Sequence, residues 1–185
     1  VNPIGPLHRK IVAYNTTTGY DTHGTHVAGT AVGDAGAADN TRGIAYGGKL
    51  AYNTIPSMTE TNLFNCFLTH HNQGARVHTN SWGNDGTTSY DGSCRGIDNF
   101  SYQYEDSLVL FAVTNLSTLK NPENAKNCLA VGASQDTPSQ GSHCSGGTGP
   151  TNDSRRKPEI YAPGCSTNSS TGSGTVCTTV TMTGT

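Results

Sequence analysis

Short apolar runs alternate along this chain with stretches that have the apolar period of an amphipathic helix. Leu108–Val113 is an unbroken apolar run, which is typical of a strand buried on both faces of a parallel sheet. Thr61–Gln73 places its apolar side chains on one helical face and is followed by Gly74, a common helix terminator. Because strands and helices alternate, the sequence predicts β-α-β units, and therefore an α/β fold with a mainly parallel β-sheet flanked by helices.

The remaining elements follow the same alternation. Helices are predicted at His23–Val32 and Cys94–Tyr104. Further strands are predicted at Lys10–Tyr14, Leu50–Ile55, Val77–Trp82, Leu129–Ala133, Glu159–Ala162 and Val176–Met182. Pro138–Asn152 is polar and rich in glycine, which predicts a long surface loop. Neither an internal repeat nor a domain boundary is visible, so one domain is expected for residues 1–185.

The composition narrows the range of partners. The 11 basic and 13 acidic residues nearly cancel, so neither a nucleic acid nor an anionic membrane surface is expected to bind. No apolar run approaches the ~20 residues that a helix needs to cross a bilayer. Hydrophobic residues make up 32% of the chain and charged residues only 13%, a balance that predicts a folded, loop-rich chain and not a disordered one.

Cysteine usage indicates the compartment. The chain has six cysteines, none of them in a CxxC pair or at zinc-ligand spacing with a histidine: Cys66, Cys94, Cys128, Cys144, Cys165 and Cys177. An even number in a polar chain predicts disulfides, although their pairing is open. Glycosylation acceptor patterns occur at Asn15, Asn99, Asn115, Asn152 and Asn168. A secreted protein, or one of the secretory pathway, is therefore expected.

The stretch Asp21–Thr30 places two histidines at a predicted helix entrance. His23 and His26 are three residues apart, whereas the zinc-protease pattern needs histidines four apart with a glutamate after the first. A zinc hydrolase is accordingly a remote alternative. The plainer interpretation is that both imidazoles pack where the helix begins.

The residues His23–Thr30, His-Gly-Thr-His-Val-Ala-Gly-Thr, resemble the histidine motif of the subtilisin-like serine proteases, or subtilases. The resemblance implies a subtilisin-like three-layer α/β sandwich. It also implies that His23 is the general base and that His26 is a packing residue one turn along. Calcium is common in the family, but no motif in this chain maps onto a calcium site, so no cofactor is expected.

Asn80–Gly83 matches the family as well. It resembles the strand that lines the first substrate pocket and pairs with the substrate backbone, which implies that Ser81, Trp82 and Gly83 bind substrate. Without that resemblance the segment reads as a strand end followed by a turn. Trp82 is the only tryptophan, and a tryptophan is more often a core anchor than a substrate contact.

Two later segments follow in the family's order. Leu110–Asn115 resembles the segment that ends in the oxyanion-hole asparagine, with Thr114 where the family usually has glycine. Asn115 directly follows the most apolar strand, and ligands in such sheets bind beyond the carboxyl ends of strands. The plain alternative is an ordinary loop asparagine, and a glycan on the acceptor pattern at Asn115 would block an oxyanion hole. Tyr161–Gly164 resembles the turn that precedes the serine segment.

The family's chain order is aspartate, histidine, serine, and both outer members are missing here. Asp21 is the sole acid before His23 and is expected to cap the helix, not to orient the imidazole. Thr181–Thr185 resembles the run into the nucleophile, which would be the residue after Thr185. Residues 1–185 are therefore expected to be a single partial peptidase domain, whose partners include the missing N- and C-terminal segments.

Together these matches imply part of a serine endopeptidase. It would cleave polypeptide substrates by a Ser-His-Asp acyl-enzyme mechanism and would be inactive as these 185 residues alone. The non-enzyme alternative is a catalytically silent subtilase-like module that binds extended peptides along Asn80–Gly83 by strand addition.

Overall fold

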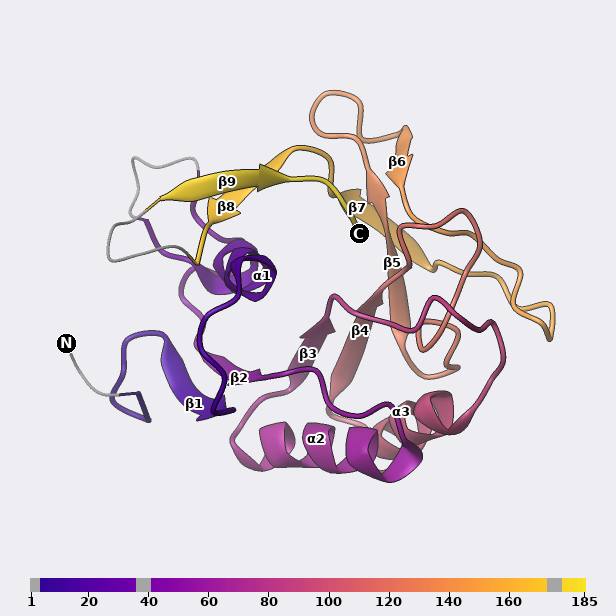
Figure 1. Ribbon diagram of the computed structural model, residues 1–185, viewed down its shortest axis with the longest axis horizontal. Helices are drawn as coiled ribbons and strands as arrows, with labels where there is room; N and C mark the ends of the chain where they lie inside the picture. The colour runs from indigo at the N-terminus through magenta and orange to yellow at the C-terminus, as the bar shows by residue number, and fades with distance from the viewer. Residues whose placement is uncertain (1–3, 36–40, 173–177) are drawn as a thin grey trace. The chain divides into compact units, whose positions relative to one another are not determined.

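A computed structural model of the protein describes residues 4–35, 41–172 and 178–185. The chain forms two compact units, whose elements are labelled in Figure 1. Unit 1 consists of Val1–Thr54 and Ser166–Met182, and unit 2 consists of Ile55–Cys165 and Thr183–Thr185. The expectation of a single domain over residues 1–185 stays a prediction.

Unit 1 combines a parallel strand pair, a helix and an antiparallel strand pair. Its elements are β1 (Ile11–Asn15), α1 (Thr22–Val32), β2 (Leu50–Asn53), β8 (Thr167–Ser170) and β9 (Thr179–Met182). β1 pairs with β2 in parallel, and β8 pairs with β9 antiparallel. Helix α1 packs against β8 (Figure 1).

Helix α1 begins where its sequence predicts. Asp21 has an extended backbone, and its carboxylate accepts the backbone N–H of Gly24 at 2.7 Å, an N-cap that satisfies one of the unpaired amides of the first turn. The small residue Gly29 faces β8 so closely that a Cβ there would lie 2.5 Å from Ser169 Oγ. Asp21 is thus a capping residue, as predicted, and Gly29 lets the helix approach the strand.

Unit 2 is built on a five-stranded sheet in the order β3-β4-β5-β6, with β7 also pairing with β5. Its strands are β3 (Val77–Asn80), β4 (Leu108–Ala112), β5 (Leu129–Ser134), β6 (His143–Ser145) and β7 (Ile160–Pro163). The pairs β3–β4, β4–β5 and β5–β7 are parallel, and β6 is antiparallel to β5. The helices are α2 (Glu60–Asn72) and α3 (Gly92–Gln103).

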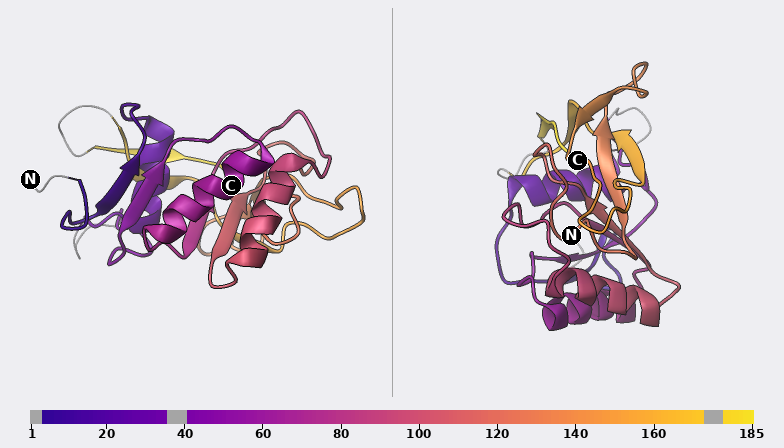
Figure 2. Two further views of the ribbon diagram at one scale, coloured as in Figure 1. Left: turned by 90° about the horizontal axis from the view of Figure 1, so that it is seen from below. Right: turned by 90° about the vertical axis from the view of Figure 1, so that its right-hand side faces the viewer.

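Helices α2 and α3 pack side by side and bury their apolar faces against the sheet (Figure 2). The core cluster takes side chains from α2, α3 and β4, among them Leu63, Phe67, Ile97, Phe100, Val109 and Phe111. The members from α2 and α3 are apolar positions that recur at helical spacing in the sequence, and Val109 and Phe111 are the buried positions that alternate along β4. The predicted class, α/β with mainly parallel strands and flanking helices, is confirmed.

Three local expectations differ from the structure. β4 is not buried on both faces, because burial alternates along it and Leu108 is 45% exposed. Pro138–Asn152 is not entirely loop, since it contains β6. β8 was not predicted, because its residues are polar and its order comes from backbone pairing with β9. The first part of the predicted strand Val176–Met182 lies outside the described residues, and the rest forms β9.

A disulfide joins Cys144 to Cys165, which agrees with the expectation that some cysteines are paired. Cys177 lies outside the described residues. In the described part of the chain, no helix is long and apolar enough to cross a bilayer.

Candidate active site

His23 is the second residue of α1 in unit 1, and it is exposed. His26, one turn further along, is only 6% exposed, and its Nε2 donates to the Thr167 carbonyl oxygen at 3.0 Å. The Ser169 hydroxyl donates to the His26 carbonyl oxygen at 3.0 Å. The structure therefore places His26 in a packing position, as predicted, and leaves the imidazole of His23 accessible.

Tyr52 of β2 is a neighbour of this helix entrance that the sequence did not single out. Its ring stacks on Tyr14 with centroids 5.2 Å apart. A Cβ on Gly24 would lie 2.6 Å from the Tyr52 hydroxyl oxygen, so a larger residue after His23 would have to displace the tip of this side chain. Burial, with a smaller contribution from Tyr14 and Asp21, raises the pKa of Tyr52, so the phenol is neutral at ordinary pH.

In unit 2, the predicted substrate and oxyanion residues follow strands that run in one direction. Ser81–Gly83 follows β3, Asn115 follows β4 and Gly164 follows β7. Because parallel strands present their carboxyl ends at the same edge of a sheet, these three segments belong to one edge.

Asn115 is exposed, and two donors fix its side chain. Its Oδ1 accepts the backbone N–H of Thr185 at 3.3 Å and the hydroxyl of Ser145 at 3.3 Å. With the oxygen held in this way, the amide can act only as a donor through its Nδ2 hydrogens. A side-chain N–H donor in a defined orientation is what an oxyanion hole requires.

The segment that resembles the run into the nucleophile lies beside Asn115. Gly184 N donates to the Gly164 carbonyl oxygen at 3.0 Å, and the Thr185 hydroxyl donates to the carbonyl oxygen of Val113. A Cβ on Gly184 would lie 3.3 Å from Asn115 Oδ1. The structure thus brings together the predicted oxyanion residue, the turn at Gly164 and the Gly184–Thr185 pair, all within unit 2.

The Cys144–Cys165 disulfide joins two segments near Asn115. Cys144 precedes Ser145, which contacts Asn115, and Cys165 follows Gly164, which binds Gly184. The cross-link therefore joins two segments that hold the Asn115 surroundings in place. Sequence reasoning predicted a disulfide but could not give this pairing.

The predicted substrate strand is tightly constrained. Trp82 is half-buried and packs edge-on against Phe111 with ring centroids 4.9 Å apart. A Cβ on Gly83 would lie 2.7 Å from the Asn121 carbonyl oxygen, which accepts the backbone N–H of Asn84 at 2.7 Å. The predicted strand to Trp82 ends at Asn80, and Ser81–Gly83 follows it as an extension in which Trp82 is anchored to the core. The substrate-binding roles of Ser81, Trp82 and Gly83 stay predictions.

A match to the model described as "Subtilase family" covers residues 8–185. The chain belongs to the subtilase family. It is 30% identical over 156 residues to "Serine protease/ABC transporter B family protein tagA" of Dictyostelium discoideum, an alignment that covers 72% of this chain and 9% of the relative. The chain therefore spans less than a tenth of that relative's length.

Solved subtilase-like structures share the fold. The prenylagaramide maturation protease PagA superposes with a TM-score of 0.68 at 22% identity, covering 98% of this chain and 66% of that one. A mutant of the protease domain of PatA gives a TM-score of 0.69 at 23% identity, covering 92% of this chain and 62% of that one. At this identity the likeness establishes the subtilisin-like fold and nothing finer.

Glu123 is the functional candidate that the subtilase motifs did not reveal. Its side chain is among the largest that are fully buried, and its carboxylate accepts two backbone amides of the segment that carries Asn115. Its only sequence signal is that it is the sole acid between β4 and β5. That signal says nothing of burial, so the residue could not be singled out.

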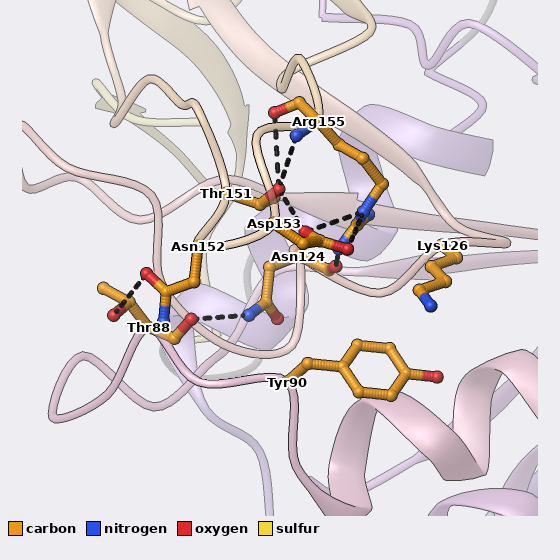
Figure 3. A pocket seen from close by; sticks show the side chains of 8 residues that line it. All are labelled: Thr88, Tyr90, Asn124, Lys126, Thr151, Asn152, Asp153 and Arg155. Atoms are coloured by element: carbon orange, nitrogen blue, oxygen red, sulfur yellow. Dashed lines mark hydrogen bonds and ion pairs between the residues drawn. The ribbon is translucent and has the colours of Figure 1, made fainter.

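A separate polar pocket of about 250 Å³ in unit 2 is lined by none of the predicted site residues (Figure 3). Its side chains bind one another: Asn124 Nδ2 donates to the Thr88 carbonyl oxygen at 3.0 Å, and Arg155 pairs with Asp153 at 2.9 Å. Hydrogen bonds from Arg155 and then Thr151 lower the pKa of Asp153 to about 2. These groups satisfy each other, so the subtilase chemistry is not assigned to this pocket.

The described residues include no group of three or more His, Cys, Asp or Glu side chains placed to hold a metal ion. His26 Nε2 donates to the Thr167 carbonyl oxygen, a contact that the packing position of His26 already explains. We therefore derive no step of this subtilase site through zinc or calcium.

Proposed function

We propose that this chain supplies the general base His23 and the oxyanion donor Asn115 of a serine endopeptidase that cleaves polypeptides through a Ser-His-Asp acyl-enzyme. The observation that carries the proposal is the double acceptor role of Asn115 Oδ1, which orients the amide as a donor beside Gly184–Thr185. The family membership supports protease chemistry in general.

Each residue has one role in this reaction. The exposed imidazole of His23 takes the proton of the serine hydroxyl as it attacks the scissile carbonyl carbon, and later gives that proton to the leaving amine. The Asn115 N–H groups stabilise the oxyanion of the tetrahedral intermediate. In subtilisin, loss of such a donor lowers kcat by about 10²–10³-fold, or about 2.7–4 kcal/mol.

The orienting aspartate and the nucleophilic serine are assigned to no residue of this chain. Asp21 is engaged at the Gly24 amide, two residues from His23 along the same helix entrance. We therefore also propose that the polypeptide 1–185 alone does not hydrolyse peptides by the triad route. The Cys144–Cys165 disulfide supports a secreted or secretory-pathway protein, since disulfides persist in oxidising compartments.

The test compares variants of the full-length protein with a fluorophosphonate probe, which labels an activated serine, and with peptide hydrolysis. His23→Ala should abolish labelling and lower kcat by about 10⁴–10⁶-fold, with little change in KM. His26→Gln is the matched control, because the amide can still donate to the Thr167 carbonyl oxygen, and it should keep kcat within about 3-fold.

Two results would count against the proposal. Serine labelling of the isolated polypeptide 1–185 would refute its inactivity. Peptide binding by the full-length protein without any turnover, unchanged by His23→Ala, would identify the silent peptide-binding module along Asn80–Gly83 instead.

A further inference from the structure

One buried carboxylate closes the loop that carries Asn115. Glu123 Oε1 accepts the backbone N–H of Thr114 at 3.1 Å and that of Lys120 at 2.8 Å. Thr114 immediately precedes Asn115, and Lys120 lies at the far end of the same loop. A single oxygen atom therefore fixes both ends of the segment 114–120.

The same carboxylate also lies against the predicted substrate strand. A Cβ on Gly83 would be 3.7 Å from Glu123 Oε2, and Asn84 N is held by the carbonyl oxygen of Asn121, two residues before Glu123. Glu123 thus binds the Asn115 loop and lies beside Gly83 of the segment to which substrate binding is assigned.

Burying this carboxylate is costly, and no cation among the described residues pairs with it to offset the cost. Glu123 is 1% exposed, and no ion pair involving it occurs in the described part of the chain. Burial raises the pKa of the Glu123 carboxyl, and nearby Asp85 adds to the rise, while the amides of Thr114 and Lys120 oppose it. A buried acid held by amides of the Asn115 loop is better explained by what it positions than by stability.

Thr114 shows how closely this loop is held. Its hydroxyl donates to Asp85 at 2.5 Å and accepts Leu116 N at 3.1 Å, and its carbonyl oxygen accepts Gly147 N at 2.8 Å. Threonine at this position departs from the family's glycine, yet it adds contacts and keeps an ordinary backbone conformation, since it is not among the residues with positive φ. With its backbone N–H on Glu123, the residue before Asn115 has every polar group engaged.

We propose that Glu123 is a positioning residue of the acyl-transfer site, acting through Asn115. By fixing the Thr114 amide, it sets the direction from which the Asn115 side chain reaches the developing oxyanion. The inference rests on the proposed function, since it assumes that Asn115 stabilises the oxyanion.

The experiment uses the full-length protein and steady-state peptide hydrolysis. Glu123→Leu removes both acceptors and should lower kcat by about 10–100-fold with less than about a 3-fold change in KM, because a misplaced donor loses most of its effect on the transition state. Glu123→Gln keeps an oxygen for both amides and should recover kcat to within about 5-fold of the unmodified protein.

A double-mutant cycle separates positioning from general damage. In an Asn115→Ala background the Glu123→Leu change should lower kcat by less than about 3-fold, because the donor that it positions is already gone. Equal losses in both backgrounds would overturn the proposal. If Glu123→Leu does not fold, Glu123→Asp replaces it, since an acid one methylene shorter cannot reach both amides at their present distances.

Glu159 provides the matched control. It also accepts a backbone amide, that of Ala130 at 2.7 Å, but it pairs with Lys157, and no hydrogen bond or ion pair joins it to the Asn115 loop within the described residues. Glu159→Leu should lower the Tm and leave kcat per folded molecule within about 2-fold. If Asn115→Ala itself leaves kcat unchanged, the oxyanion assignment fails and the inference falls with it. If only the coupling is absent, the proposed function stands and the role of Glu123 does not.

Discussion

In unit 2, side chains of α2, α3 and β4 form an aromatic and aliphatic core, whereas unit 1 is held by polar and close backbone contacts. The buried positions among the described residues of unit 1 are His26, Gly29, Gly43 and Ser169. Several of its large apolar side chains are open to solvent, with Leu7 at 86% and Tyr20 at 73% exposed.

The difference matters because the two proposed catalytic groups lie in different units. Asn115 follows a strand whose neighbours are anchored in the core, so its position is set by dense packing as well as by hydrogen bonds. His23 lies on a helix that is positioned by an N-cap, a glycine contact and two hydrogen bonds of His26. Unit 1 should therefore be the less stable of the two and the more sensitive to single polar or glycine changes.

The largest expected contrast comes from removing one aromatic ring in each unit. Phe100 is fully buried, and its ring centroid lies 5.4 Å from Phe67 and 5.2 Å from Tyr104. Phe100→Ala should lower the free energy of unfolding by about 3–5 kcal/mol, since it leaves a cavity in the core. Tyr20→Ala should change it by less than about 0.5 kcal/mol. Urea unfolding of the full-length protein measures both, and similar losses would contradict the contrast.

The second prediction concerns acid sensitivity of the unit 2 core. His78 is buried between Phe67 and Phe100, and its Nε2 has no hydrogen-bond partner within the described residues. Burial, then the nearby charges of His70, His71 and Arg76, lower its pKa to about 4. As the pH falls, His78 of the unfolded chain therefore binds a proton before His78 of the folded chain does. The free energy of unfolding should be highest above about pH 6.5 and should fall by roughly 3 kcal/mol as the pH approaches 4.

Unfolding at pH 7 and pH 4.5 tests this acid sensitivity. His78→Phe should flatten the dependence, because a phenyl ring fills the same aromatic site without a proton to gain. His143→Phe removes an exposed histidine of unit 2 and is the control. If the free energy of unfolding of His78→Phe depends on pH as strongly as that of the unmodified protein, another group is responsible for the acid sensitivity.

The sequence predicted the two units unequally well, for a physical reason. Helices α2 and α3 were found because their burial leaves an apolar period in the sequence. β8, with the sequence Thr-Asn-Ser-Ser, leaves no such signal, because backbone pairing and not apolar burial holds it. The alternating burial of β4 could not be predicted, because the residues on its more exposed side are apolar as well.

The candidate site also has a part that the sequence predicted and a part that it did not. Local motifs indicated His23 and Asn115, which are read from neighbouring residues. The contacts of Asn115 with Thr185 and Ser145 join positions 70 and 30 residues apart, and no spacing rule predicts them. Glu123 could not be predicted either, because its proposed role depends on its burial, and a single acid in a loop is ordinarily exposed.

The third prediction tests the glycine contact of unit 1. In Gly29→Ala the new Cβ would lie 2.5 Å from Ser169 Oγ, and such overpacking costs about 1–3 kcal/mol, partly offset by a gain of about 1 kcal/mol in helix propensity. A net loss of up to about 2 kcal/mol is expected, with faster amide exchange in α1. Gly19→Ala, with no atom within 4 Å of the new Cβ, is the control. Ser169→Gly removes the 2.5 Å contact but also the hydrogen bond to the His26 carbonyl oxygen, and Ser170 Oγ stays 3.0 Å from the new Cβ, so only part of the loss should be recovered in the double variant relative to Ser169→Gly alone. No recovery in that comparison would contradict the Ser169 contact as the cause.

The smallest expected effect concerns Asp21 of unit 1, which caps α1 two residues before the proposed general base His23. Asp21→Ala removes the cap on Gly24 N and should cost about 1 kcal/mol, as should Thr59→Ala, which removes the corresponding cap of α2 in unit 2. Asp21→Asn keeps a capping oxygen, so stability should change by only a few tenths of a kcal/mol and kcat by less than about 2-fold. An orienting aspartate behaves differently, since changing it to asparagine lowers kcat by about 10⁴-fold. A loss of that size in Asp21→Asn, with the fold intact, would identify Asp21 as the triad acid. The N-cap residue of α1 would then also orient the imidazole of His23.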